Sequence, residues 1–157
     1  MFLSCVPPQT NHHAKRIVRI GKFSRLADKP ELVAAKELLD TLLVPHQIPA
    51  PIAGPYTLHL SFTWPWLGKH SKRTRALGRI PHTSRPDCDN CSKSITDRLV
   101  RLRFIEDDKA IVRLEVEKWW GDEPGILVEI SSFRDVVGEF FRHGAHAPAM
   151  GGECVRT

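Results

Sequence analysis

Two acidic pairs in a basic segment constrain the fold of this chain more than any other feature. Asp87 and Asp89 stand two residues apart, and Asp107 and Asp108 follow about one helix length later. A helix between the pairs, followed by a strand that starts at the second pair, would bring carboxylates from both toward one ion. Carboxylate oxygens are hard ligands that suit a magnesium-type cation. The segment therefore predicts a small fold built around a divalent-metal site.

Positive charge is concentrated around these carboxylates. A formal net charge of +5 is weak evidence of an anionic partner when taken alone. Between Lys69 and Arg103, however, there are ten Lys or Arg residues and three acids, two of which are Asp87 and Asp89. A metal site within a basic surface is typical of a nuclease, because the substrate is a polyanion. The side chains that we assign to DNA contacts are Asn11, Lys15, Arg16, Lys69, Lys72, Arg73, Arg75, Arg79, Arg85 and Lys118.

Composition indicates an ordinary globular domain. The chain has 157 residues, of which 41% are hydrophobic and 26% charged, so one domain with one core is expected. No apolar run approaches the roughly 20 residues that span a bilayer, and the first six residues lack the basic flank of a signal peptide. Four cysteines do not make a disulfide framework in a chain of this length. We therefore expect a cytoplasmic protein without a membrane partner.

Hydrophobic periodicity predicts an α+β fold with a small mixed sheet and two main helices. We expect helices at residues 30–43, with Asp28 as N-cap, and 90–103. Strands are expected at residues 2–6, 56–64, 110–119 and 126–131, the last two forming an antiparallel hairpin at a sheet edge. Residues 65–86 show no periodicity and are expected to be a long loop, disordered without a ligand.

The chain divides into two parts on this basis. Residues 1–132 are expected to form the catalytic domain, and residues 133–157 a C-terminal extension with a short helix followed by a flexible tail. Core packing is expected for Trp64 and Trp119, although tryptophans can also stack on unpaired bases.

Local geometry suggests how the first acidic pair meets the ion. Pro86 disfavours helix before it, and residues two apart in extended backbone point the same way. Asp87 and Asp89 would then face the ion while Cys88 faces the core. Lys93, one helical turn after Asp89, would stabilise negative charge on a phosphate. The alternative is that Asp87 or Asp89 only caps the helix and that Lys93 is solvated.

A resemblance supports the first interpretation. The pattern Asp87-x-Asp89-Asn90-x-x-Lys93, followed by Asp107-Asp108-Lys109-Ala110-Ile111-Val112 and Lys118, resembles the RusA family of Holliday junction resolvases. An opening Pro-Pro-x-x-Asn element is similar as well, as Pro7-Pro8-Gln9-Thr10-Asn11. The similarity covers roughly residues 2 to 131.

The resemblance implies a function and a site. It implies that Asp87, Asp89 and Asp108 are the catalytic carboxylates that bind Mg²⁺, or Mn²⁺ in its place, and that Lys93 is the essential lysine. Asn90 and Asp107 would have supporting roles, with Asp107 the second choice as third ligand. It also implies a homodimer with a mixed α/β fold that cuts four-way DNA junctions by paired, symmetric nicks.

Some residues depart from the family pattern. Cys88 and Cys91 replace aliphatic residues, Pro86 replaces a basic or polar one, and the resemblance does not explain the chain after Ser131. Cys88-x-x-Cys91 could also form half of a zinc site, with His82 and Cys154 as the other candidates. Two other functions stay open: a non-catalytic protein that binds branched or single-stranded DNA, and a DNA-binding regulator, for which no helix-turn-helix pattern is present.

Overall fold

The fold is built on a five-stranded mixed sheet. The computed structural model of the protein describes residues 1–9 and 15–133. Strand β4 is central and lies between its parallel partner β6 and its antiparallel partner β7. The short strands β1 and β5 pair antiparallel with β7 and β6 at the two edges. In spatial order the strands are β1 (Phe2–Leu3), β7 (Gly125–Ser132), β4 (Tyr56–Pro65), β6 (Ile111–Gly121) and β5 (Arg79–Pro81).

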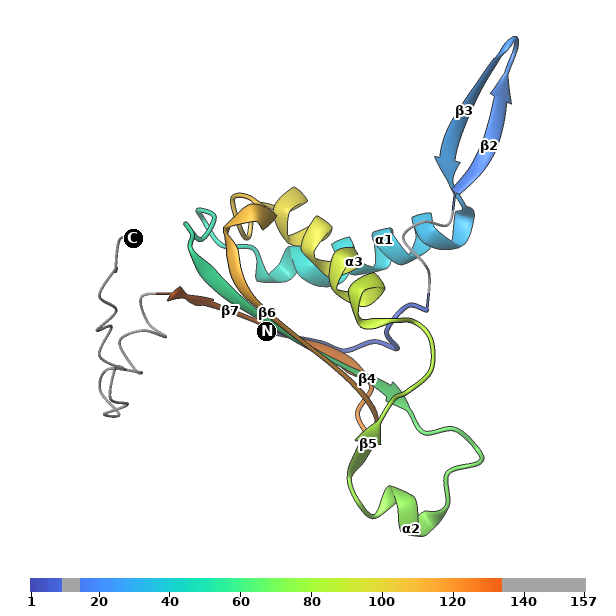
Figure 1. The fold of residues 1–157 in the computed structure, drawn as a ribbon, viewed down its shortest axis with the longest axis vertical. Coiled ribbons are helices and arrows are strands. Elements are labelled where there is room, and N and C mark those ends of the chain that lie inside the picture. Colours follow the sequence, from blue (N-terminus) through green and yellow to red (C-terminus); the bar gives the residue numbers. More distant parts are fainter. Residues whose placement is uncertain (10–14, 134–157) are drawn as a thin grey trace, which may run out of the picture.

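Two helices cover one face of the sheet, and two main helices are what the sequence predicts. Helix α1 (Pro30–Leu43) and helix α3 (Cys88–Arg101) lie side by side over β4, β6 and β7 (Figure 1). Single-turn helices follow α1, as η1 (Val44–His46), and precede β6, as η2 (Asp108–Ala110). The α+β class, the small mixed sheet and the two main helices are therefore confirmed.

Alternation along β4 creates the core. Leu58, Leu60, Phe62 and Trp64 are at most 3% exposed and point to the helix-covered face, because every second residue of a strand faces the same way. Ile95 and Leu99 of α3, also fully buried, pack in the same cluster. Burial of each such side chain contributes about 1.5–3 kcal/mol. This packing fixes α3, and with it the polar face that α3 turns outward.

The predicted hairpin of the last two strands is wrong. Strands β6 and β7 do not pair with each other, because β4 lies between them and pairs with both. The Gly121–Gly125 connection therefore crosses the end of β4 and does not close a hairpin. A close approach requires Gly125, where an added Cβ would lie 2.1 Å from Cζ of Phe2. On its other side β6 pairs with β5 over residues 119–121, and the His82 amide donates to the Lys118 carbonyl at 2.9 Å. Among the described residues, the outer edge of β6 is therefore open only before Lys118.

The predicted long loop is also wrong. Residues 65–86 contain a short helix, α2 (Lys72–Arg75), and strand β5, and the structure describes every residue of them. The Ser71 hydroxyl caps α2 by accepting from the Thr74 amide at 3.1 Å. Trp66 donates to Asp122 at 2.8 Å and ties the segment to the β6–β7 turn. We call residues 65–81 the α2 segment.

A two-stranded arm, absent from the sequence prediction, precedes α1. Strands β2 (Lys15–Ile20) and β3 (Phe23–Asp28) pair only with each other and project beyond the end of α1 (Figure 1). Asp28 ends β3, and Lys29 is the N-cap of α1 without a side-chain bond. The expectation that Asp28 caps α1 is therefore wrong; its carboxylate binds Lys15 and Lys36 instead.

Three smaller features of the structure differ from the sequence predictions. Strand β1 ends at Leu3 and not at Val6, and α3 begins two residues earlier than predicted. Trp120, 8% exposed, faces the core in place of Trp119. No helix within the described residues is long and apolar enough to cross a membrane. The predicted extension after residue 133 and Asn11 lie outside the described residues.

Candidate active site

An acidic groove lies between α3 and the open edge of β6. It has a volume of about 490 Å³ and is open to solvent. Asp89 and Lys93 line it from α3, and Asp108 lines it from η2. These three residues of the sequence prediction therefore meet although they come from two separate stretches of chain. The remaining lining is Ser92 and Thr96 of α3 with Ile111 and Leu114 of β6.

Lys93 is the cation of the acidic groove. Its ammonium lies 2.8 Å from Oδ1 of Asp97, one helical turn along α3, and 3.2 Å from Oδ2 of Asp108. Hydrogen bonds to Asp97 first, and to Asp108 second, raise the pKa of Lys93 above its usual value. Lys93 therefore stays protonated at neutral pH, as a group that stabilises phosphate charge must. Asp97 was not among the predicted site residues.

The two residues of the second acidic pair, Asp107 and Asp108, face different surroundings. Asp107 turns away from the acidic groove and caps η2, accepting from the Lys109 amide at 3.0 Å and pairing with the Lys109 ammonium. Asp108 enters the acidic groove. The fully buried Tyr56 donates from its hydroxyl to the carbonyl of Asp107. Tyr56 of β4 thus holds the turn that presents Asp108, a role that sequence patterns do not reveal.

The first acidic pair occupies the start of α3. Asp87 is the exposed N-cap, without a side-chain cap bond, and Asp89 lies in the first turn. Negative side chains at this end are favoured by the helix dipole. Because α3 begins at Cys88, Asp87 and Asp89 are not on one extended stretch, and the expectation that Cys88 faces the core is wrong. Cys88 is exposed, and Cys91 is the buried cysteine.

The acidic side chains of the described residues do not form a metal cluster. Among the described residues, no group of three or more His, Cys, Asp or Glu side chains is placed to hold an ion. Asp89 and Asp108 share the acidic groove with Lys93, whereas Asp87 is not part of its lining. The zinc alternative gains no support among these residues either, because Cys88 is exposed whereas Cys91 is buried, so the two thiols do not lie on one accessible surface.

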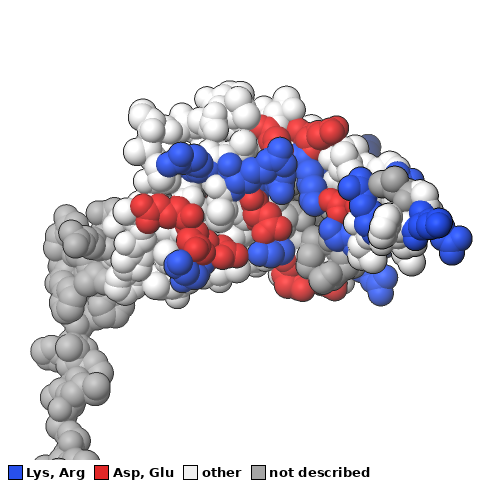
Figure 2. Space-filling view, turned by 90° about the horizontal axis from the view of Figure 1, so that it is seen from above, with Lys and Arg blue, Asp and Glu red and all other residues white. Residues whose placement is uncertain are grey.

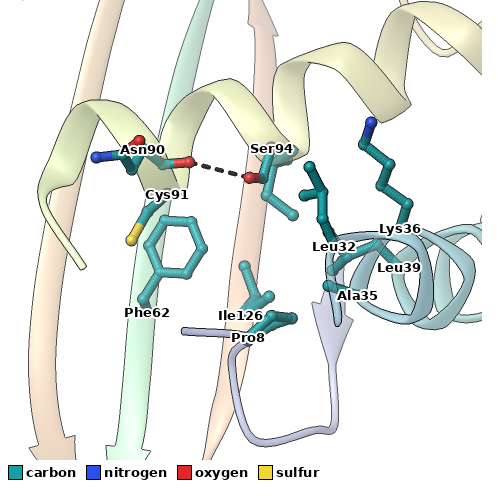
Figure 3. A pocket seen from close by; sticks show the side chains of 11 residues that line it. Pro8, Leu32, Ala35, Lys36, Leu39, Phe62, Asn90, Cys91, Ser94 and Ile126 are labelled. Carbon is teal, nitrogen blue, oxygen red and sulfur yellow. Dashed lines mark hydrogen bonds between the residues drawn. The ribbon is translucent and has the colours of Figure 1, made fainter. Parts of the chain in front are cut away.

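Asn90 lies on the opposite side of α3 from the acidic groove. Together with Cys91 and Phe62 it lines a cavity of about 20 Å³ between α3, α1 and the sheet (Figure 3). Its backbone carbonyl accepts from the Ser94 hydroxyl at 3.0 Å. Asn90 therefore lies on the cavity side of α3 and does not line the acidic groove with Asp89.

Lys118 fixes the approach to α3. From β6 its ammonium donates to the carbonyls of Ser84 and Pro86, at 2.7 and 2.6 Å. Pro86 is buried and directly precedes the N-cap Asp87. The ammonium that the sequence analysis assigns to DNA thus acts inside this chain, where it holds the turn that starts the helix.

The other residues assigned to DNA fall into two groups. Lys15 pairs with Asp28, Arg75 donates to the carbonyls of Leu67 and His70, and Arg79 lies 4.3 Å above the ring of Trp119. The remaining side chains are exposed, and no hydrogen bond or ion pair holds them within the described residues. They are Arg16 on the arm, Lys69, Lys72 and Arg73 on the α2 segment, and Arg85 before α3.

Comparison with known proteins identifies the family. The family model for endodeoxyribonuclease RusA matches residues 6–131, a range that includes every residue of the acidic groove. The chain belongs to the RusA family. RusA proteins are endodeoxyribonucleases, so the acidic groove lies in a chain of an enzyme family that cuts DNA.

Two relatives define how far individual similarity extends. A protein of Lactococcus phage r1t, named crossover junction endodeoxyribonuclease RusA, is 43% identical over 49 residues, which are 31% of this chain and 37% of the phage protein. The uncharacterized protein YqaN of Bacillus subtilis strain 168 is 27% identical over 118 residues, 72% of this chain and 82% of that protein. The RusA match over most of the chain thus rests on the family pattern, and the stronger identity is local.

Proposed function

We propose that the protein is a divalent-metal-dependent endonuclease that resolves four-way DNA junctions by paired, symmetric nicks. The observation that carries the proposal is the convergence of Asp89, Lys93 and Asp108 on one open groove in a RusA-family chain. Exposed Lys and Arg side chains on the arm, on the α2 segment and before α3 supply the positive surface that branched DNA requires.

The donor set of the acidic groove fits a hard divalent ion. Asp89 and Asp108 supply carboxylate oxygens, and the lining contains no histidine or cysteine, a donor set that suits Mg²⁺ or Mn²⁺. In this proposal Asp89 and Asp108 hold the ion, and Asp87, at the same end of α3, is the third carboxylate. The bound ion supplies Lewis acidity and a water of lowered pKa for phosphodiester hydrolysis.

Lys93 is the side chain that stabilises the reacting phosphate in this proposal. Its protonated ammonium is held by Asp97 and Asp108, so it is already oriented before the substrate arrives. An oriented cation of this kind stabilises the negative charge that develops on the scissile phosphate. Asp97 is then a positioning residue, because it acts on the reaction only through Lys93.

A homodimer follows from the reaction. The described part of one chain carries one acidic groove, whereas a four-way junction must be nicked on two opposed strands, which a two-fold dimer matches. The open edge of β6 beside the acidic groove is the surface that we assign to pairing. An unpaired strand edge readily adds another strand, and Val112 on it is 55% exposed.

A cleavage assay with a synthetic junction tests the function. The wild-type protein, Asp89→Asn and the control Glu123→Gln, an exposed acid on the β6–β7 turn, are incubated with a four-way junction and a linear duplex of the same sequences. With Mg²⁺ we expect paired nicks in the junction from wild type and control, and none from Asp89→Asn, which should still bind. Cleavage by Asp89→Asn within a few-fold of wild type would exclude this carboxylate from the site.

The second candidate is a protein that binds branched DNA without cutting it. The Lys93–Asp108 ion pair favours it, because one carboxylate of the acidic groove already has a cationic partner without a metal. The same assay separates the two: junction binding without cleavage under any divalent ion would support the binder and overturn the nuclease.

A further inference from the structure

Within the described residues, the β2–β3 arm forms a sheet of its own that is separate from the main sheet. Its strands pair with each other over six residues each and with no strand of the main sheet. Gly21, with φ +61°, allows the tight turn at its tip. The arm projects from one end of the molecule and the α2 segment from the other, so that the start of α3 lies between them (Figure 1).

The root of the arm is fixed to α1. Asp28, the last residue of β3, receives the ammonium of Lys15 from β2 and that of Lys36 from α1, the latter at 2.5 Å. Hydrogen bonds from Lys15 and Lys36 hold the pKa of Asp28 at about 2, so the link persists at neutral pH. The arm therefore has a defined direction relative to the helices and to the acidic groove.

The charge of the arm suits a polyanion. Its acid, Asp28, is already bound at the root. Beyond the root, four basic side chains are exposed, and no carboxylate pairs with them within the described residues. Figure 2 shows Lys and Arg gathered at the end of the molecule where the arm projects, whereas both charges are mixed over the rest of that face. These four residues are Arg16, Arg19, Lys22 and Arg25.

The apolar side chains of the arm favour DNA over protein as the partner that the arm binds. Phe23 is 82% exposed, Ile17 71% and Leu26 68%. Ile17 and Leu26 are opposite each other and share one face, whereas Phe23, three residues from Leu26, points to the other face. A protein-docking surface would gather apolar groups on one side; here they are divided between two faces and interspersed with arginine.

We propose that the arm lies in a groove of one duplex branch of the DNA and that Phe23 inserts between bases at the branch point. This inference rests on the proposed function and specifies how its substrate is recognised. A two-stranded ribbon fits the major groove, about 12 Å wide, and six residues per strand reach about 20 Å. Arg19 and Lys22 then contact phosphates beside the tip, and Phe23 reaches the base stack.

Insertion by Phe23 gives a physical reason for preferring branched DNA. An apolar side chain that enters a base step must unstack it. In continuous duplex all stacking at the step is lost, whereas bases at a branch point are already incompletely stacked. The same side chain therefore costs less at a junction, and the arm discriminates by structure without reading sequence.

The test uses a junction with 2-aminopurine at the branch point, whose fluorescence rises when it is unstacked. Binding is measured in chelator, so that cleavage does not intervene, for the full chain, for Phe23→Ser and for the control Leu77→Ser. Leu77, on the α2 segment, is 71% exposed, so the control removes an equally exposed apolar group. We expect a severalfold rise with wild type and control, and little rise with Phe23→Ser bound to saturation.

Two further measurements complete the test. Replacement of Arg16, Arg19 and Arg25 by alanine should lower the salt slope of junction affinity by about three units, near one for each lost phosphate contact. An unchanged fluorescence rise with Phe23→Ser would overturn the proposed insertion of Phe23 between bases. Loss of dimers on light scattering, with DNA affinity and salt slope unchanged in the arginine variant, would assign the arm to a second copy and also overturn it.

The outcomes separate the two proposals. A wild-type protein that unstacks the branch point in chelator but never cuts with a divalent ion would refute the nuclease and leave the arm as proposed. Normal junction cleavage by wild type, with Phe23→Ser identical to it in unstacking and rate, would refute only the arm. Thermal unfolding of each variant confirms that these surface substitutions leave the fold intact.

Discussion

The ammonium of Lys93 lies 3.2 Å from Oδ2 of Asp108 and joins the middle of α3 to the turn before β6. These residues are 15 positions apart in the chain, and their contact defines the acidic groove. Both side chains are about half exposed, so the pair is worth little to stability. In the proposed function its importance lies in placing a cation and a carboxylate together on the surface that DNA contacts.

Lys93→Ala should lower the single-turnover cleavage rate about a hundredfold, on the scale of losing one oriented stabiliser of phosphate charge. Junction affinity should change only a few-fold. The control is Lys109→Ala, since Lys109 pairs with Asp107 away from the acidic groove, and this variant should cut at nearly the wild-type rate. Equal losses of rate and affinity in Lys93→Ala would make Lys93 a phosphate anchor.

Tyr56→Phe should loosen the presentation of Asp108. The substitution removes the hydroxyl that donates to the Asp107 carbonyl and should cost about 1–3 kcal/mol, because a partly buried acceptor loses its partner. Urea unfolding measures the loss, and single-turnover kinetics should show a slower rate at unchanged affinity. Phe62→Leu, a core change away from the turn, should destabilise the fold without that specific loss of rate; equal rates in the two variants would remove Tyr56 from the site.

The basic residues of the α2 segment should fall into two kinds, those that bind DNA and one that stabilises the segment. Lys72→Ala with Arg73→Ala should lower the salt slope of junction affinity by about two units, because each lost phosphate contact removes nearly one. Arg75→Ala should instead disturb the segment, since Arg75 donates to the Leu67 and His70 carbonyls. Limited proteolysis should show faster cleavage of the α2 segment in Arg75→Ala alone. Faster proteolysis in the Lys72 and Arg73 variant as well would contradict this division.

His59 should make stability depend on pH. On the uncovered face of the sheet its Nδ1 lies 2.8 Å from Oε2 of Glu129, and this bond, with smaller contributions from neighbouring glutamates, raises the pKa of His59. A raised folded-state pKa stabilises the protein below the unfolded value of 6.5, and the gain is lost as pH rises through the folded value. The free energy of unfolding of His59→Gln should therefore fall below wild type near pH 6 and approach it by pH 9.

A matched histidine controls for this effect. His46, exposed at the end of η1, has no carboxylate partner within the described residues. Urea unfolding of His46→Gln at the same two pH values should show no such convergence. A pH-independent difference for His59→Gln would mean that His59 stabilises the sheet by packing and not by charge.

Val112→Lys should disrupt the dimer, because a charge on an open strand edge opposes pairing with a second strand. Light scattering should report monomers, and a supercoiled cruciform plasmid should accumulate singly nicked circles. Leu77→Lys, an equally drastic change on the α2 segment, should leave both unchanged. A Val112→Lys dimer with full paired cleavage would move the interface away from β6.

The parts of the fold that follow local patterns could be predicted from the sequence. The apolar stripe that ends in Leu39 and Leu43 predicts α1, and the alternation along β4 predicts the central strand. Because the register of α3 is set by Ile95 and Leu99, the positions of Asp89 and Lys93 on its outer face follow from the sequence as well. Such elements are fixed by residues near one another in the chain.

The errors have long-range or subtle local causes. Nothing within Gly121–Gly125 reveals that β4 lies between the two flanking strands, because that order depends on contacts 50 or more residues away. The arm carried a local signal, the Gly21-Lys22 turn between two alternating stretches, but its arginines masked the strand pattern. Tyr56 and Asp97 could not be found, because a hydroxyl bound to a distant carbonyl and a helix-surface carboxylate leave no distinctive spacing.

The position of β7 in the chain also determines when the five-stranded sheet can be completed during synthesis. Strand β1 pairs only with β7, Phe2 opposite Leu127 and Leu3 opposite Ile126, and β4 needs β7 for one of its two edges. Until residue 132 is available, the first strand has no partner and the central strand keeps an exposed hydrophobic edge. Pairings so distant in the chain form slowly, and exposed strand edges invite aggregation. The nascent chain is thus most vulnerable just after the acidic groove has been translated, when every residue of the site exists but the sheet beneath it is still open.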